Sequence, residues 1–339
     1  MLRRATVLCL TPVLAPGVFS PCDALAREQL ALEEVIVTAQ RRTQSLQDVP
    51  ISIVAMDQQV LEMRGIDEIE DIGLEVPNFT VNTFPSDSTT IRLFIRGIGQ
   101  NDAQITQDPS VALYLDGVYI GTSVAAGFEG VDVQRIEILR GPQGTLYGRN
   151  ATGGAVNIIT RTASTERLEF RQDLTAGNLD KFQSKTTLNL PLADTVAAKF
   201  NYNYTTRDGW VENNGPGEDF SNEDRRSAVA DLRWLAGDVV VDYRFESARI
   251  EDSEPFNQLL SDPAESNGQV AGLIVYDGGF DTDRLDEVTS QRSILSADQE
   301  ITAHSLWLHW EIDDMLRLES ISAYRELDGF SPTDFLPTA

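Results

Sequence analysis

From residue 163 onward, hydrophobic and polar side chains alternate along the chain. Residues 199–204 read KFNYNY, which places aromatic rings on one side of an extended chain and Lys or Asn on the other. Similar runs recur up to residue 326. The pattern predicts seven β-strands, each with an apolar and a polar face, at residues 167–176, 181–191, 196–206, 226–236, 239–250, 300–312 and 316–326.

The connections between these strands alternate in length. Residues 192–195, 236–238 and 313–314 form short links, whereas residues 207–225 and 251–299 form long ones. Alternation alone also fits an ordinary half-buried antiparallel sheet. Short turns at one end, long loops at the other and aromatic residues near the strand ends favour an outer-membrane barrel. Seven strands leave two open edges, whose unpaired backbone groups cost several kcal/mol each in lipid, and large outer-membrane barrels have about 22 strands. We therefore expect residues 163–339 to be the N-terminal part of a transmembrane β-barrel.

Residues 49–162 have a different, α/β texture. They predict a strand at residues 51–54, helices at residues 57–64 and 66–74, and a hairpin that turns at Asp116 and Gly117. The expected fold class is therefore an α/β domain, which the resemblance described below makes a plug domain, followed by antiparallel strands of an incomplete barrel.

The first 26 residues resemble a secretory signal peptide. Arg3 and Arg4 precede an apolar stretch, and the small residues Ala24 and Ala26 suit signal peptidase. Residues 27–48 follow as a predicted periplasmic segment. Both cysteines, Cys9 and Cys22, lie within the predicted signal. Beyond it the sequence lacks the run of about 18 apolar residues that a transmembrane helix needs, so strands would have to span the membrane.

Charge and residue content narrow the function further. The chain has 53 acidic against 27 basic residues, a formal net charge of -26, which disfavours binding to nucleic acid. We expect no catalytic residues, metal site or cofactor, because the mature chain has no cysteine and no nucleophile–base pairing. His304 and His309 are five residues apart on a strand and point to opposite faces. The acidic long loop, with Asp277, Asp281, Asp283, Asp286 and Glu287, is either a solvated loop or a cation site.

A glycine-rich motif joins the two regions. Residues 139–148 read LRGPQGTLYG and residues 150–160 read NATGGAVNIIT. The glycines permit tight turns, and the Gly-Lys-Ser/Thr ending of a phosphate-binding loop is absent. The motif resembles the end of the plug domain of TonB-dependent outer-membrane receptors, and VPISI at 49–53, IRG at 95–97 and YLDGVY at 114–119 resemble earlier plug motifs. The plug motif residues are Arg96, Gly97, Asp116, Gly117, Arg140, Gly141, Pro142, Gly144, Tyr147, Gly148, Gly153 and Gly154.

The resemblance implies a coupling segment and a means of holding the plug. The TonB box would be Glu33, Glu34, Val35, Ile36, Val37, Thr38 and Ala39, an extended segment to which the periplasmic protein TonB adds a strand. The alternative is that this segment is simply the first strand of the plug. Arg96 and Arg140 would pair with barrel glutamates, unless they are ordinary solvated charges.

The resemblance also implies the function. It predicts a receptor in the Gram-negative outer membrane that imports a scarce nutrient, most commonly a ferric siderophore, with energy from TonB and its inner-membrane complex. Partners would be TonB, outer-membrane lipid and the nutrient. The alternatives are a passive pore or adhesin, and a surface-signalling receptor. A signalling receptor would need a further domain before the TonB box, where only residues 27–32 intervene.

Overall fold

The computed structural model describes residues 36–38, 44–66, 69–84, 87–102, 106–124, 131–256, 283–290 and 293–331. All of them belong to one structural unit, Val35–Ala339. Several predictions fall outside these residues: the signal peptide at 1–26, Glu33, Glu34, Val35 and Ala39 of the predicted TonB box, and Asp277 and Asp281 of the acidic loop.

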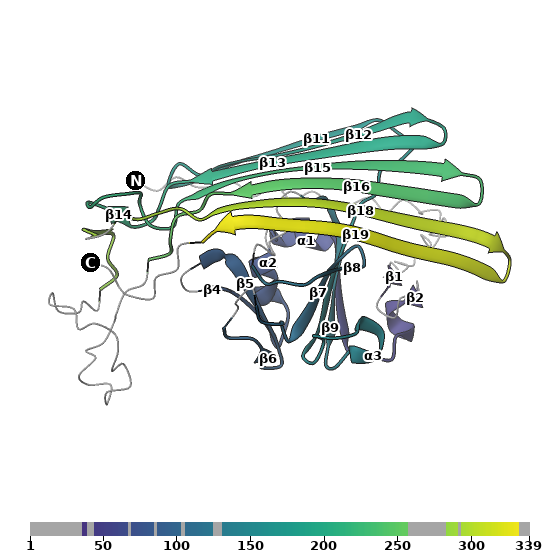
Figure 1. Ribbon diagram of the computed structural model, residues 1–339, viewed down its shortest axis with the longest axis horizontal. Coiled ribbons are helices and arrows are strands. Elements are labelled where there is room, and N and C mark those ends of the chain that lie inside the picture. Colours follow the sequence, from purple (N-terminus) through teal and green to yellow (C-terminus); the bar gives the residue numbers. More distant parts are fainter. Residues whose placement is uncertain are drawn as a thin grey trace, which may run out of the picture. The chain divides into compact units, whose positions relative to one another are not determined.

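The central sheet of the α/β part has five strands in the order β3-β9-β10-β7-β8 (Figure 1). These are β3 (Ile53–Asp57), β7 (Val111–Leu115), β8 (Val118–Ile120), β9 (Val133–Arg140) and β10 (Gly154–Thr160). Within this sheet only the β10–β7 pair is parallel. Leu113, Ile136, Ile138, Val156 and Ile158 of this sheet lie in the main hydrophobic core.

Two short helices and a smaller sheet complete this core. Helix α1 (Gln58–Arg64) begins at Asp57, whose carboxylate accepts a hydrogen bond from the N–H of Val60, and ends at Gly65 in the left-handed conformation. Helix α2 spans Ile69–Glu75, later than the predicted 66–74. The small sheet consists of β4 (Phe79–Phe84), β5 (Asp87–Ile95) and β6 (Ile98–Gly99), which the sequence pattern did not predict.

The predicted hairpin at Asp116 and Gly117 is confirmed. Both residues have positive φ angles, 49° and 82°, as a two-residue turn between twisted strands requires. Shorter elements are β1 (Ile36–Val37), β2 (Gln44–Ser45), the 3-10 helix η1 (Leu46–Asp48) and α3 (Gly144–Tyr147).

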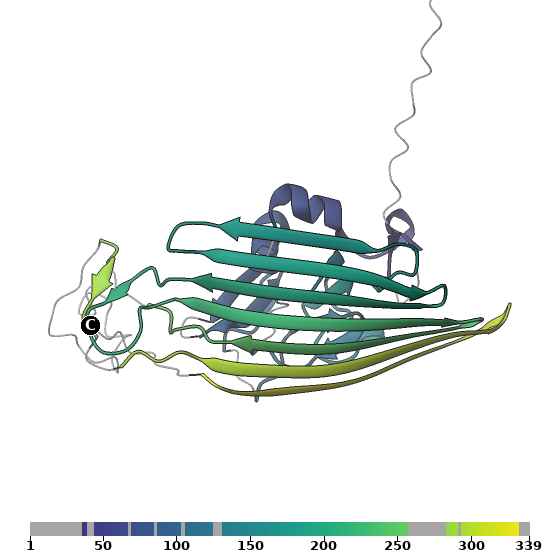
Figure 2. The ribbon, with the colours of Figure 1, turned by 90° about the horizontal axis from the view of Figure 1, so that it is seen from above.

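The second half forms a seven-stranded antiparallel sheet in the order β11-β12-β13-β15-β16-β18-β19, seen from above in Figure 2. Its strands are β11 (Glu169–Ala176), β12 (Phe182–Ala193), β13 (Val196–Arg207), β15 (Glu223–Ala236), β16 (Val239–Ile250), β18 (Asp298–Asp313) and β19 (Leu316–Phe330). Two further short strands, β14 (Glu212–Asn213) and β17 (Glu287–Val288), pair within the long connections.

All seven predicted strands are present, and β16 has the predicted bounds. Strand β15 begins three residues earlier than the predicted 226–236, because Glu223 pairs across the sheet with Arg207 of β13 at 2.5 Å. This extension is polar on both faces, so hydrophobic alternation does not detect it.

The exposure of the two faces is the reverse of that in a water-soluble sheet. On the apolar face Trp234 and Phe200 are 52% and 47% exposed, whereas on the polar face Lys199 and Asn203 are 3% and 1% exposed. A sheet surrounded by water buries its apolar face. The inverted arrangement fits a sheet with hydrocarbon on its apolar side and protein on its polar side. Among the described residues, no helix is both long and apolar enough to cross a membrane.

Candidate functional site

The turn between β7 and β8 presents a carboxylate to the seven-stranded sheet. Asp116 is held rigidly: its backbone N–H donates to the carbonyl of Ile158 at 2.9 Å, and its carboxylate accepts from the N–H and hydroxyl of Thr160 at 2.8 and 2.7 Å. The predicted plug residues Asp116 and Gly117 therefore lie at the contact between the two parts of the chain.

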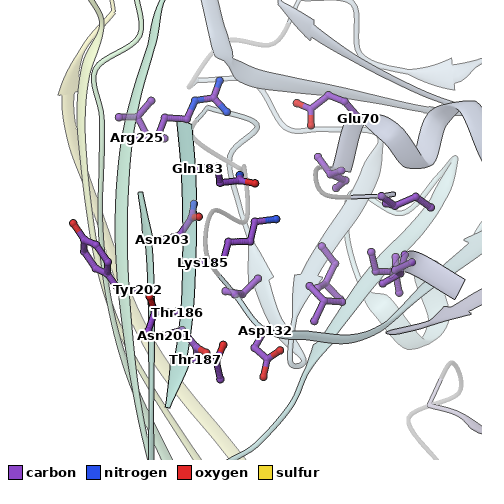
Figure 3. A pocket seen from close by; sticks show the side chains of 18 of the residues that line it. Glu70, Asp132, Gln183, Lys185, Thr186, Thr187, Asn201, Tyr202, Asn203 and Arg225 are labelled. Atoms are coloured by element: carbon purple, nitrogen blue, oxygen red, sulfur yellow. The ribbon is translucent and has the colours of Figure 1, made fainter. Parts of the chain in front are cut away.

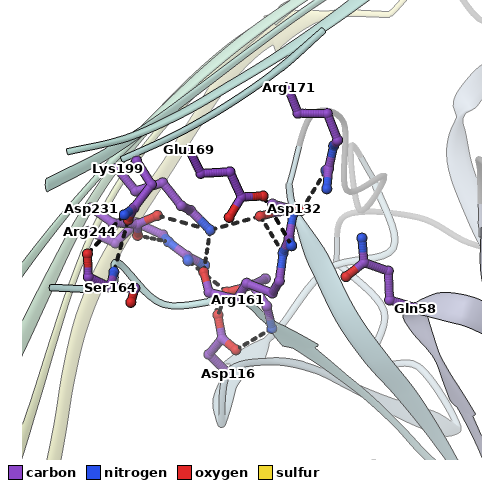
Figure 4. Close-up of polar contacts among 12 residues, drawn as sticks. Gln58, Asp116, Asp132, Arg161, Ser164, Glu169, Arg171, Lys199, Asp231 and Arg244 are labelled. Atoms are coloured by element: carbon purple, nitrogen blue, oxygen red, sulfur yellow. Dashed lines mark hydrogen bonds and ion pairs between the residues drawn. The ribbon is translucent and has the colours of Figure 1, made fainter. Parts of the chain in front are cut away.

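Arg244 of β16 binds this carboxylate from the polar face of the sheet (Figure 4). Its Nη1 donates to Asp116 Oδ2 at 2.7 Å, its Nη2 to the Thr160 hydroxyl at 2.7 Å, and its Nε to Asp231 of β15 at 2.6 Å. The indole N–H of Trp307 donates to the backbone carbonyl of Asp116 at 2.8 Å. We call Asp116, Thr160, Asp231, Arg244 and Trp307 the Arg244 anchor.

A buried carboxylate, Asp132, makes a second contact between the two parts, which we call the Asp132 anchor. Arg161 donates to both of its oxygens at 2.8 Å, Arg171 of β11 donates at 2.8 Å, and Lys199 of β13 at 3.1 Å. Lys199 also donates to the backbone carbonyl of Arg161 and lies 4.0 Å from Asp231. Lys199 therefore links Asp132 to Asp231 of the Arg244 anchor (Figure 4). Removing one partner of a buried ion pair strongly destabilises the folded protein.

The Asp132 contact should depend on pH. Burial acts to raise the pKa of the Asp132 carboxyl, but the hydrogen bond from Arg161 and the charges of Lys199 and Arg161 outweigh it and lower the pKa from 3.8 to about 2. A depressed pKa stabilises the folded state above pH 4, and we expect that stabilisation, about 2 kcal/mol, to be lost as the pH falls from about 4 to about 2. Urea unfolding across this range should show the loss, and Asp132→Asn should abolish that part of the pH dependence. An unchanged pH profile in Asp132→Asn would contradict the assignment.

A cavity of about 130 Å³ lies beside Asp132, between the α/β part and the sheet (Figure 3). One wall is apolar, from residues such as Leu61, Ile69 and Ile136, and the other is polar, with Gln183 and Asn201 of the sheet. A cavity of this size and polarity accommodates several water molecules. The two parts are therefore joined by polar and charged contacts with a cavity beside them.

Residues 36–38, the first that the structure describes, pack on the face of the central sheet opposite helices α1 and α2. Val37 is completely buried among Val49, Tyr114, Leu139 and Tyr147. The N–H of Thr38 donates to the buried carboxylate of Glu137 at 2.8 Å. Of the predicted TonB box, Ile36 and Val37 form β1, which pairs with β2.

The other motif residues have mainly structural surroundings. Tyr147 packs edge-on against Tyr114, with ring centroids 5.1 Å apart. A side chain at Gly153 would meet the backbone of Ile98, and one at Gly154 would meet the backbone of Leu139. Gly141 and Gly148 have positive φ angles, and Pro142 follows Gly141 directly.

Arg96 and Arg140 do not belong to either anchor. Arg96 is exposed, and Arg140 donates to the carbonyl of Pro77 at 3.4 Å. Their predicted pairing with barrel glutamates stays a prediction. In the contacts that cross between the two parts, the charges have the other arrangement: Asp116 and Asp132 of the α/β part face Arg244, Arg171 and Lys199 of the sheet.

The anchor residues of the sheet were missed at the sequence level. The signal was present, since Lys199, Asp231 and Arg244 all occupy polar-face positions of predicted strands. The alternation shows that these side chains lie on the polar face. It does not show whether that face contacts another part of the protein or solvent. Among the described residues, no group of three or more His, Cys, Asp or Glu side chains has the arrangement of a metal site.

Comparison with known families defines the class of protein. Residues 45–155 match the family "TonB-dependent Receptor Plug Domain". The match runs from the end of β2 through β9, α3 and the start of β10, so the α/β part matches a plug domain, and the chain resembles the TonB-dependent receptors. The members it resembles are transport receptors and not enzymes.

Individual relatives extend the likeness beyond the plug. The pesticin receptor of Yersinia pestis is 31% identical over 191 residues, 55% of this chain and 27% of the receptor. A vitamin B12 transporter of Vibrio vulnificus is 29% identical over 144 residues, 41% of this chain and 22% of the transporter. The chain thus spans about a quarter of the length of these two curated relatives.

A solved structure shows the fold of both parts. The crystal structure of the ferric yersiniabactin uptake receptor from Yersinia pestis covers 82% of this chain and 41% of that receptor, with a TM-score of 0.68 and 20% identity. The predicted fold class, a plug followed by part of an antiparallel barrel, is confirmed. From here the α/β part is called the plug and the seven-stranded sheet the barrel sheet.

Proposed function

We propose that the chain serves in energised uptake of a scarce nutrient across the outer membrane. The observation that carries this proposal is the docking of Val37 and Thr38 on a plug that is anchored to the polar face of the barrel sheet. A segment docked on the plug through a few contacts is suited to transmit a pull, and the cavity beside the anchors leaves room for the plug to yield to it.

The proposal includes the finer assignments made from the sequence. Residues 1–26 act as signal peptide, residues 33–39 as TonB box in the periplasm, residues 49–162 as plug, and residues 163–339 as barrel strands in the outer membrane. The short turns then face the periplasm. TonB is the energising partner and lipid contacts the apolar face.

For the nutrient we propose a large metal chelate, with a ferric siderophore first. The support is that two relatives are named for ferric yersiniabactin uptake and vitamin B12 transport, both metal chelates. Binding assays with ferric siderophores and cobalamin, side by side, would assign the nutrient.

Proline at position 36 tests the coupling role. Ile36→Pro removes a backbone N–H and disfavours the added strand that TonB requires. We expect at least a tenfold loss of nutrient uptake, while display at the cell surface and nutrient binding remain normal. Ile36→Val keeps a β-branched residue in extended backbone and is the matched control. Unchanged uptake in Ile36→Pro would overturn energised transport and favour a passive pore or adhesin.

A further inference from the structure

Glu137 of β9 is a buried charge at the point where the coupling segment meets the plug. Its side chain is completely buried. The N–H of Thr38 donates to Oε1 at 2.8 Å, and the Thr38 hydroxyl lies 3.2 Å from the same oxygen. Arg135 donates to Oε1 at 2.9 Å and Asn157 to Oε2 at 3.3 Å.

Strand pairing contributes little to holding the coupling segment. β1 and β2 are two residues long, with Ile36 opposite Ser45 and Val37 opposite Gln44. Among the described residues, the segment contacts the central sheet instead through the apolar packing of Val37, the bonds of Thr38 to Glu137, and a bond from Arg135 to the Thr38 hydroxyl at 3.2 Å. Hydrogen bonds to a charged acceptor are roughly twice as strong as neutral ones, so the carboxylate is the main polar tie.

If the coupling segment undocked, the Glu137 carboxylate would still have hydrogen-bond partners. Once Thr38 departs, Glu137 keeps its ion pair with Arg135 and its bond from Asn157, which is its cross-strand partner on β10. The costly state of a buried charge without partners does not arise. The contact can therefore open and close reversibly while the plug stays folded.

We propose that Glu137 is a latch, a positioning residue that keeps the coupling segment docked in the resting receptor. While the latch is closed, Val37 is buried and the N–H of Thr38 is engaged, so a periplasmic strand has no free backbone to pair with at these residues. The proposal rests on the coupling role proposed above. Asn157 and Thr160 lie on the same strand, β10, which places the latch and the Arg244 anchor on one element.

Thiol labelling at position 37 measures the opening of the latch directly. Val37→Cys, made with Cys9→Ser and Cys22→Ser in the full chain, puts a thiol where the side chain is buried in the docked state. A soluble maleimide then reacts only with the undocked fraction. We expect Glu137→Gln to speed labelling about tenfold, which corresponds to about 1.4 kcal/mol. Thr38→Val removes only the hydroxyl and should give a smaller increase.

The matched control is Glu62→Gln, which neutralises an exposed carboxylate on α1 and should leave the labelling rate unchanged. Equal labelling rates in the parent, Glu137→Gln and Thr38→Val would overturn the latch. If Glu137→Gln does not fold, Thr38→Val decides alone, because it leaves the bonds of Glu137 to Arg135 and Asn157 in place.

A second experiment distinguishes the latch from the coupling role. It tests for a disulfide cross-link from the thiol of the Val37→Cys variant to a cysteine in the TonB C-terminal domain. Faster labelling in the Glu137→Gln and Thr38→Val variants without any cross-link supports the latch and refutes coupling to TonB. Equal labelling in all variants with a normal cross-link refutes the latch and leaves the coupling role intact.

Discussion

Replacing Arg244 by alanine is expected to destabilise the junction of plug and barrel sheet by about 3–5 kcal/mol. Arg244 is 5% exposed and joins Asp116, Thr160 and Asp231. Its removal leaves the buried Asp231 carboxylate and the partly buried Asp116 carboxylate without their main cation, and such a loss costs more than the ion pair itself contributes. Urea unfolding in detergent micelles, followed by the fluorescence of Trp307 at the same contact, measures the change.

Arg317→Ala is the matched control for this prediction. Arg317 of β19 forms a pair with Glu311 at 2.6 Å, but both side chains are more than half exposed. Exposed ion pairs contribute little to stability because water screens them, so the control should unfold nearly as the parent does. Arg244→Lys should lie between the two, since it keeps the charge without the forked geometry. Equal unfolding of Arg244→Ala and Arg317→Ala would refute the anchor.

Gly154→Ala is expected to prevent the plug from folding. Gly154 has a φ of 152°, and an added Cβ would lie 2.1 Å from the carbonyl oxygen of Leu139 on the neighbouring strand. Because β9 and β10 pair along this stretch, the clash cannot be relieved by a side-chain rotation, and the cost should exceed about 4 kcal/mol. Protease digestion should degrade the plug of this variant rapidly.

Gly144→Ala tests whether this effect belongs to the position or to any glycine of the motif. Gly144 opens helix α3, and a Cβ there meets no atom within 4 Å. Alanine favours helix over glycine by about 0.8–1.0 kcal/mol, so this variant should be as protease-resistant as the parent or more so. A Gly154→Ala variant with parental resistance would contradict the described close approach of β9 and β10.

The strands of the barrel sheet were predictable because their environment dictates a simple rule. Each strand has one apolar and one polar face, so every second residue is apolar, and this parity is visible without tertiary information. The Asp116–Gly117 hairpin was predictable for a local reason as well, since its turn needs two residues that tolerate positive φ.

The plug's contacts with the barrel sheet were not predictable in this way. The start of β5, Asp87 to Thr90, has no hydrophobic period, yet it is largely buried. The Asp87 carboxylate accepts bonds from the hydroxyls of Thr89 and Thr90, and Gln299 of β18 donates to the Thr89 hydroxyl at 2.7 Å. A surface that packs against a polar barrel wall is itself polar, and its sequence therefore resembles a solvated loop.

Contacts between buried polar and charged residues that are far apart in the sequence were equally hard to predict. Lys199 and Asp132 are 67 residues apart, and Thr38 and Glu137 are 99 apart. Nothing local distinguishes these side chains from the many solvated acids and bases of a chain with net charge -26. The sequence motifs identified the family, but the residues that hold the plug and the coupling segment emerge only from the fold.

The central claim is that the barrel sheet has lipid on its apolar face and the plug on its polar face. Three strand tryptophans test it most directly: Trp234 and Trp310 are exposed on the apolar face, and Trp307 donates to Asp116 on the polar face. In vesicles of phospholipid brominated at a shallow carbon, single-tryptophan variants that retain Trp234 or Trp310 should lose fluorescence by contact with bromine. A variant that retains Trp307 should keep its fluorescence, and quenching of Trp307 with protection of Trp234 and Trp310 would contradict the account.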